Sequence, residues 1–589
     1  MASAVRRDSG PRLPKEVTEQ TRLLSPSGGE LRYGRSLTVP EVSQRRPRSS
    51  VSSSMSRRSM RVTRSSWFLM LLTLSIGGLQ IAWSVELSNG SPYLLSLGIS
   101  KAMLALVWVA GPVSGALVQP YVGIRSDNCR VSWGKRKPFM IGGGIATIIS
   151  LLILGWAKEI CAFILPDRSP SLPTVTIWVA VLMIYVLDFS INTVQAGIRA
   201  FIVDNAPPHQ QDAANAWAGR MTGIGNVLGY LSGYVNLPEI LPWFGNTQFK
   251  VLCVIASIAL GGTLAVSCGF IMERDPNEDG PADEKKNNVL AFFGQVLHSA
   301  RRLPPQVRKV CDTQFFAWIG WFPFLFYSTT YIGEIYVQPH YAANPNPSRE
   351  EEHKLWEDAT RVGTFALLVF AVVALTANTV LPVFIQPAFN PTNANEGAPS
   401  KHQRLVALLR IPGLTLRRLW CFSHVIFAAS MWSTFFVKNT WGATALIAAC
   451  GIPWAVTLWA PFALISSDIS KRDAIKHGVL RSSVSTTGGV GDLVGEDGED
   501  YVDQAGIILG LHNFAIAAPQ VIATVMSSLI FKMLQKPRGS TDDTSMAWVM
   551  RFGGLAAVLA AVMTLRLDEE VDEGLEFVDS DEDVEEEEV

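Results

Sequence analysis

The chain has 589 residues, of which 48% are hydrophobic and 17% charged, and its mean hydropathy is +0.23. This composition is too apolar for a soluble protein of this length and indicates a polytopic membrane protein. The formal net charge of -1 conceals two opposite ends, because residues 1–66 are rich in Arg and Ser whereas residues 567–589 are mostly acidic. Both ends are predicted to be disordered, solvated tails.

The apolar segments between these tails predict an all-α membrane protein. At about 20 residues per crossing, twelve transmembrane helices are expected. They form one half over residues 67–271 and a second half over 312–566, with a polar connection at 272–311 and a loop at 468–503. The predicted crossings lie near 67–90, 103–124, 138–157, 175–204, 214–235, 249–271, 312–337, 361–387, 419–437, 441–467, 504–533 and 545–566.

The connections between the crossings predict the orientation of the chain. Basic residues gather in the even-numbered connections, which include RSDNCRVSWGKRK and SKRDAIKHGVLR. By the positive-inside rule, these connections and both termini are expected in the cytoplasm. The connection at 338–360 is polar and is expected on the external side.

The fourth predicted crossing carries two ionisable residues, Asp188 and Arg199, inside an apolar segment. Such groups cost roughly 2.5–3.5 kcal/mol each on insertion scales, which makes them functional by default. Eleven residues separate them. That is three helical turns, so both side chains lie on one face but about 16 Å apart along the axis. They are predicted to line one pathway without forming a direct pair.

The connection after the second crossing reads GIRSDNCRVSWGKRKPF. It resembles the signature loop of the major facilitator superfamily, which bridges the helical halves of the bundle on the cytoplasmic side through ion pairs. A basic cluster that only anchors the topology is the alternative. The residues that carry the resemblance are Gly123, Asp127, Arg130, Gly134, Lys135 and Arg136.

Longer runs resemble a narrower family within that superfamily, the proton-coupled sucrose and glycoside transporters of plants and their fungal and animal relatives. They include SPYLLSLGISKAMLALVWVAGPVSGALVQPYVGIRSDNCRVSWGKRKPFMIGGG, LDFSINTVQAGIRAFIVD, WIGWFPFLFY and LHNFAIAAPQ. The chain departs from the plant pattern at Lys101, which replaces an external histidine, and at Glu334 in the seventh crossing, which replaces an arginine. Glu86 in WSVEL is more similar to the fungal and animal branch.

The resemblance implies a twelve-helix major facilitator fold and proton-coupled symport of a disaccharide or glycoside of the sucrose or maltose class. It implies that Asp188 carries the proton and contacts the sugar, and that Arg199 belongs to the substrate site. A structural contact between helices is the alternative for Asp188. For Arg199 the alternative is pairing with Asp204 near the cytoplasmic end.

Further polar and aromatic residues are candidates for coupling and sugar binding. Glu86 and Glu334 are candidate coupling residues, although counting along their helices places both near the external interface, where they could instead be gate residues or solvated helix ends. Neutral polar groups and aromatic rings suit sugar hydroxyls and sugar faces, with interhelical contact or packing as the alternative. The predicted substrate contacts of this kind are Asn192, Gln195, Asn513, Trp321 and Phe322.

The remaining predictions concern cofactors and class. The seven cysteines show no metal-binding spacing, so neither metal nor cofactor is expected and protons are the coupling ion. No nucleotide-binding loop, paired catalytic carboxylates or nucleic-acid partner is expected. A proton-linked or facilitative carrier of a monosaccharide or other glycoside, and a non-transporting sugar sensor, remain the rival interpretations.

The N-terminal tail contains EQTRLL, in which Glu19, Leu23 and Leu24 fit the acidic dileucine pattern of a cytoplasmic sorting signal. A sorting adaptor is therefore a candidate partner, besides the sugar substrate and the lipid bilayer. The chain is expected in the plasma membrane or a vacuolar membrane.

Overall fold

The computed structural model describes residues 63–166, 169–207, 210–273, 294, 303–385, 408–476, 480–482, 501–537, 540, 543–568 and 575–577. All of them belong to the unit Met60–Val589. Helices dominate this part of the chain. In the first half they are α2 (Ser66–Val85), the π turn η1 (Glu86–Gly90), α3 (Ser91–Ser96), α4 (Lys101–Val107), α5 (Ala110–Asp127), α6 (Lys137–Gly155), α7 (Ala157–Ile164), α8 (Leu172–Asn205), α9 (Gln211–Tyr234), α10 (Leu237–Ile240), the 3-10 turn η3 (Pro242–Phe244) and α11 (Gln248–Phe270).

The second half is also built from long helices. They are α13 (Pro305–Ala343), α14 (Arg349–Phe384), α16 (Leu416–Ser433), α17 (Thr440–Ala449), α18 (Gly451–Lys476), α19 (Tyr501–Leu534) and α20 (Ser545–Thr564). Two three-residue strands, β1 (Leu480–Ser482) and β2 (Leu575–Phe577), pair antiparallel. Apart from this strand pair, the regular elements of the described residues are helical, and the predicted all-α membrane fold is confirmed.

Several helices begin at the residue types that favour a helix start. Ser65, Thr247 and Thr415 each accept a hydrogen bond from the backbone N–H three residues ahead. Ser348 and Glu351 form a reciprocal capping box at the start of α14. Such side chains satisfy N–H groups that the first helical turn leaves unpaired.

As far as the structure describes them, helices occupy most of each range predicted to cross the membrane. Nine helical segments are long and apolar enough to span a bilayer by length and composition within the described residues. The other three, α9, α13 and α16, reach at least 18 residues but do not meet the same apolarity criterion. The helical membrane fold is confirmed, while the count of twelve crossings stays a prediction.

The predicted external connection at 338–360 is largely helical. Helix α13 continues to Ala343 and α14 begins at Arg349, where the capping box starts it. Sequence counting ended α13 too early and began α14 too late, because the last turn of α13 and the first turns of α14 carry polar residues.

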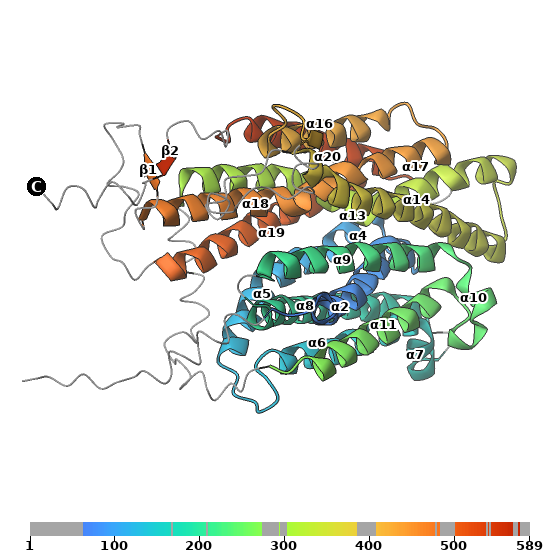
Figure 1. The fold of residues 1–589 in the computed structure, drawn as a ribbon. Coiled ribbons are helices and arrows are strands. Elements are labelled where there is room, and N and C mark those ends of the chain that lie inside the picture. The colour runs from blue at the N-terminus through green and yellow to red at the C-terminus, as the bar shows by residue number, and fades with distance from the viewer. Residues whose placement is uncertain are drawn as a thin grey trace, which may run out of the picture. The chain divides into compact units, whose positions relative to one another are not determined.

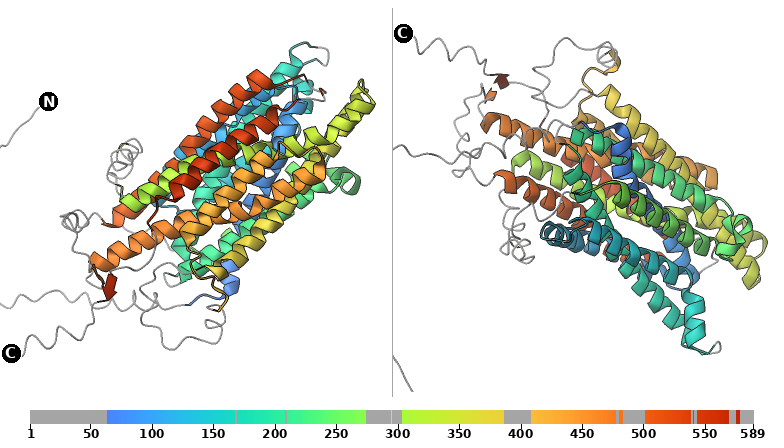
Figure 2. Two further views of the ribbon diagram at one scale, coloured as in Figure 1. Left: turned by 90° about the horizontal axis from the view of Figure 1, so that it is seen from above. Right: turned by 60° about the horizontal axis from the view of Figure 1, so that its bottom comes forward.

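The two sets of helices pack mainly within themselves. In Figure 1 the helices up to α11, blue to green, lie below those from α13 onward, yellow-green to red. Both views of Figure 2 show the long helices running side by side along one common direction. The halves meet where α9 packs on α14, and where α19 packs on α4 and α5. Helix α13 also contacts η1, which brings the seventh predicted crossing against the first.

Candidate functional site

A pair of buried carboxyl groups lies where α8 packs against the first crossing. Asp188 is fully buried and Glu86 is 2% exposed. The two carboxyls are close enough to interact electrostatically. No hydrogen bond joins them, and neither accepts one from another group among the described residues.

This pairing corrects the predicted depth of Glu86. Counting residues along a regular helix placed it near the external interface, but the contact with Asp188 puts both groups at one depth. The chain forms a π turn from Glu86 to Gly90, and such turns inside α-helices are frequent at functional sites.

Two glycines make room around the carboxyl pair. A Cβ on Gly90 would lie 2.7 Å from the Trp108 ring, so the turn can approach this ring only without a side chain. A Cβ on Gly111 of α5 would lie 3.5 Å from Oδ1 of Asp188. Helix α5 therefore presents backbone, and no side chain, to the carboxyl.

Predicted sugar-binding amides lie close to Asp188. Asn192 donates to the Asp188 carbonyl at 2.9 Å and to Ser114 Oγ at 2.8 Å, and it accepts from Gln119 at 2.8 Å. Gln195 accepts from the Trp83 indole at 3.2 Å. From the second half, Asn513 donates to the Gly115 carbonyl at 3.3 Å. These residues lie in helices α2, α5, α8 and α19.

Arg199 lies on α8 beyond this polar group and is exposed. It forms no ion pair or hydrogen bond with any residue that the structure describes. Asp204, its alternative partner in the sequence interpretation, instead accepts from Arg136 at 2.7 Å. Arg199 and Asp188 are thus not paired, as the spacing predicts.

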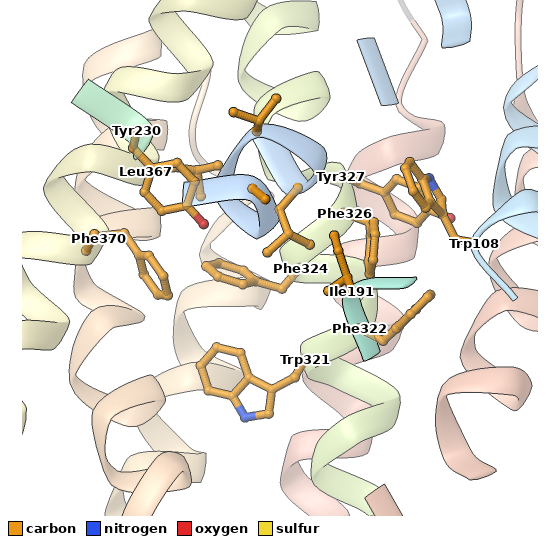
Figure 3. Packing of buried hydrophobic residues seen from close by; sticks show 14 of the residues in the cluster. Trp108, Ile191, Tyr230, Trp321, Phe322, Phe324, Phe326, Tyr327, Leu367 and Phe370 are labelled. Atoms are coloured by element: carbon orange, nitrogen blue, oxygen red, sulfur yellow. The ribbon is translucent and has the colours of Figure 1, made fainter. Parts of the chain in front are cut away.

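Trp321 and Phe322 lie within aromatic packing (Figure 3). Each is 1% exposed. Trp321 stacks against Phe427 at 4.2 Å between ring centroids, and Phe322 packs 4.7 Å from Phe326. In this conformation neighbouring side chains cover both rings, and their role in sugar binding stays a prediction.

The same aromatic region closes the seam between the halves beside η1. Trp108 and Phe326 have ring centroids 4.5 Å apart. Ser91 accepts from the Trp108 indole at 3.1 Å and donates to the Phe326 carbonyl at 2.7 Å. This group, which we call the aromatic seam, joins the first half to α13.

Lys101 joins the two halves at a second place. It lies at the end of the bundle where α4 and α20 begin, which we call the Lys101 end. It forms ion pairs with Glu334 of α13 and with Asp543, the latter at 2.7 Å. The side chains are only 10% to 12% exposed. Hydrogen bonds from Lys101 and Ser545 hold the pKa of Asp543 below its ordinary value, although partial burial alone would raise that pKa. Glu334 is therefore not a solvated helix end.

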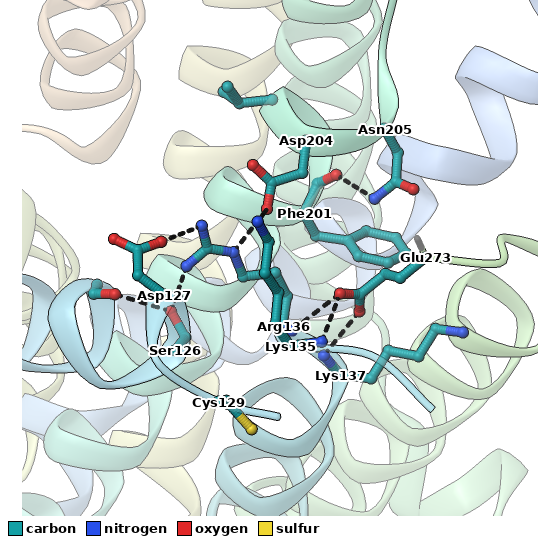
Figure 4. Close-up of polar contacts among 12 residues, drawn as sticks. Ser126, Asp127, Cys129, Lys135, Arg136, Lys137, Phe201, Asp204, Asn205 and Glu273 are labelled. Carbon is teal, nitrogen blue, oxygen red and sulfur yellow. Dashed lines mark hydrogen bonds and ion pairs between the residues drawn. The ribbon is translucent and has the colours of Figure 1, made fainter. Parts of the chain in front are cut away.

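The opposite end, which we call the Arg136 end, carries the predicted signature loop (Figure 4). Arg136 bonds to Ser126, Asp127 and Asp204, and Lys135 lies 3.6 Å from Asp204. Although burial alone would lower it, the hydrogen bonds to Asp204 and Asp127 raise the pKa of Arg136. The loop thus connects α5, α6 and α8 through ion pairs, all within the first half, whereas the resemblance predicts a bridge between the helical halves.

Other signature residues have separate roles. The Arg130 side chain donates to the Asp127 carbonyl at 2.9 Å. A Cβ on Gly134, whose φ is +135°, would lie 2.5 Å from Glu273. A Cβ on Gly123 would meet nothing within 4 Å.

The sequence analysis missed Glu273, which follows α11. Its carboxylate accepts from the backbone N–H groups of Lys135, Arg136 and Lys137 at 2.8 to 3.0 Å. It thereby caps the start of α6, where an anion is favoured. A lone acidic residue after a crossing carries no signal of this role, since its partner lies far away in sequence.

The family assignment agrees with this geometry. Residues 70–495 match the model of the Major Facilitator Superfamily. The chain belongs to the Major Facilitator Superfamily. It is accordingly a multi-pass membrane protein, and the fold and superfamily expected from the signature loop are confirmed.

Curated relatives and one solved structure extend the comparison. The chain is 37% identical over 552 residues to the general alpha-glucoside permease of Schizosaccharomyces pombe, covering 85% of this chain and 93% of the relative. It is 32% identical over 325 residues to the sucrose transport protein SUT3 of Oryza sativa subsp. indica, covering 52% of this chain and 62% of that protein. A solved structure of a proton-dependent oligopeptide transporter covers 85% of this chain with a TM-score of 0.53 and 10% identity, and supports the fold alone.

Proposed function

We propose that the protein is a proton-coupled symporter of an α-glucoside, a disaccharide of the maltose or sucrose class. The similarity to an alpha-glucoside permease over most of both chains supports the substrate class. The buried Glu86–Asp188 pair supports proton coupling, and it is the observation on which the mechanism depends.

The pair suits a proton carrier because two neighbouring carboxyls without other donors cannot both be ionised. One shared proton leaves a single charge in the buried site, and a second proton removes it. Loss of charge favours movement through a dry intermediate, so proton binding and the conformational change become linked. Glu86 is thus a coupling residue together with Asp188.

The sugar would bind next to this pair. Asn192, Gln195 and Asn513 offer neutral donors and acceptors from both halves, and Arg199 is unpaired in the described structure and free to engage a ligand. A substrate held between two halves stabilises the conformations in which both contact it.

The ion pairs of Lys101 support a gate function for Glu334, while its coupling role stays a prediction. The gate joins the halves at the Lys101 end, and transport requires it to open. We place this end outside the cytoplasm and the basic Arg136 end inside, with both termini cytoplasmic.

The direct test is uptake of labelled maltose, sucrose and glucose by transporter-deficient cells at several external pH values, with and without a protonophore. Accumulation that needs the proton gradient supports symport, and uptake indifferent to it indicates facilitated diffusion. In proteoliposomes, Asp188→Asn should abolish uphill accumulation but retain maltose exchange. Retained accumulation in this variant would exclude Asp188 as the proton carrier.

The sorting proposal rests on sequence alone. Glu19, Leu23 and Leu24 lie outside the described residues. A fluorescent fusion carrying Leu23→Ala and Leu24→Ala should shift from a vacuolar membrane to the cell surface if an adaptor reads the motif. An unchanged distribution would contradict it.

A further inference from the structure

A cavity of about 700 Å³ lies at the Lys101 end, with lining residues from both halves. Its volume lies within the roughly 300–1,000 Å³ of small-molecule sites. Lining residues range from the exposed Lys158 to the buried Asn89, Thr329 and Thr330. The hydroxyls of Thr329 and Thr330 have no hydrogen-bond partner among the described residues.

The lining balances its charges. Among the described residues it contains five lysine or arginine side chains and five carboxylates. Some are already paired, as in Lys101 with Glu334 and Lys250 with Glu159. A balanced set of charges does not attract an ion of either sign, but it offers many donors and acceptors to a neutral polar ligand.

The cavity also has rigid aromatic surfaces. Trp356 of α14 donates its indole N–H to the Tyr341 hydroxyl at 3.2 Å, which fixes the ring. From the first half, Tyr93 and Phe249 stack with centroids 4.1 Å apart. Flat apolar faces beside dense polar groups match the two kinds of surface that a pyranose ring presents.

The cavity is separate from the carboxyl pair. Neither Glu86 nor Asp188 is among its lining residues. Asn89 lines it, whereas Gly90 packs on Trp108 of the aromatic seam. A ligand in the cavity therefore does not touch the carboxyls in this conformation.

We propose that this cavity, the vestibule, is a second saccharide site that holds an α-glucoside before the gate opens. The inference rests on the proposed function for the choice of ligand. It adds a binding step that precedes contact with the Glu86–Asp188 pair.

The test counts bound ligand. Full-length protein in lipid nanodiscs is equilibrated with radiolabelled maltose, and the bound maltose per protein is measured at saturation. Wild type should bind two molecules. Trp356→Ala should bind one, because it removes the Trp356 ring from the vestibule and leaves the proposed sugar site beside the Glu86–Asp188 pair intact. Trp243→Ala is the matched control, since this tryptophan is 72% exposed and does not line the cavity.

A second variant guards against misfolding. Gln338→Trp fills the cavity from α13 without removing a packed ring, and it should also reduce the ratio from two to one. A ratio of one or none in wild type overturns the vestibule site, as does a ratio of two in both variants. These outcomes do not depend on uphill accumulation, so failure of the vestibule and failure of the symport proposal are distinguishable.

Discussion

The carboxyl groups of Glu86 and Asp188, 102 residues apart in the chain, interact electrostatically in a buried site where neither has a described hydrogen-bond partner. A pair that shares a proton acts as one unit, so its two members should not contribute independently.

A double-mutant cycle tests this unit. Glu86→Gln and Asp188→Asn should each lower the initial rate of pH-driven maltose uptake into proteoliposomes by a large and similar factor, and the double variant should be no slower than either. Coupling energies for groups in contact are about 0.5–3 kcal/mol. Maltose exchange serves as the control for folding. Losses that simply add would show that the carboxyls act separately.

The Lys101 gate predicts a charge-swap rescue. Lys101→Glu places three carboxylates together and should reduce maltose uptake several-fold, since like charges that are partly buried repel strongly. Adding Glu334→Lys restores a cation between two anions and should recover much of the uptake. Lys354→Glu is the control, because Lys354 is exposed and does not line the vestibule. If the double variant does not recover maltose uptake, the ion pair between Lys101 and Glu334 does not control the uptake rate.

The lowered pKa of Asp543 predicts a pH-dependent contribution to stability. A carboxyl whose pKa is lower in the folded state stabilises the protein above its ordinary pKa of 3.8, and this contribution disappears as pH falls through the folded value. Asp543→Asn should therefore lower the thermal midpoint at pH 5 to 7, and the difference from wild type should shrink below about pH 3.8 and vanish once the pH is below the lower folded-state pKa. A difference that persists in acid would refute the electrostatic origin.

The close packing of Gly90 on the Trp108 ring predicts that no larger side chain is tolerated at position 90. Gly90→Ala inserts a methyl group 2.7 Å from the ring and should cost about 1–3 kcal/mol, seen as a lower thermal midpoint. Gly262→Ala, where a Cβ would meet nothing within 4 Å, should be neutral or slightly stabilising. Equal effects at the two positions would argue against this packing.

The three contacts of the Arg136 guanidinium predict that a positive charge at this position is not sufficient for transport. Arg136→Lys keeps the charge but cannot bond Ser126, Asp127 and Asp204 together, so maltose uptake should fall several-fold. Arg125→Lys is the control, because Arg125 is an exposed arginine in the last turn of α5, and it should have little effect on uptake. Uptake comparable to wild type in Arg136→Lys would limit the loop to a topological role.

The amino-acid sequence by itself determined the helical membrane class and the superfamily, and it singled out the fourth crossing. Apolar length and the cost of a buried charge are local properties, so Asp188 and the Arg136 loop stand out along the chain.

Only the tertiary structure decided which of these groups meet. Glu86 and Asp188 belong to different crossings, so counting along either helix could not show that their carboxyls are neighbours. The partners of Lys101 come from elements more than 200 residues away, and the vestibule depends on how the halves pack. Pairing across helices depends on rotation and depth within the bundle, which the period of one helix does not determine.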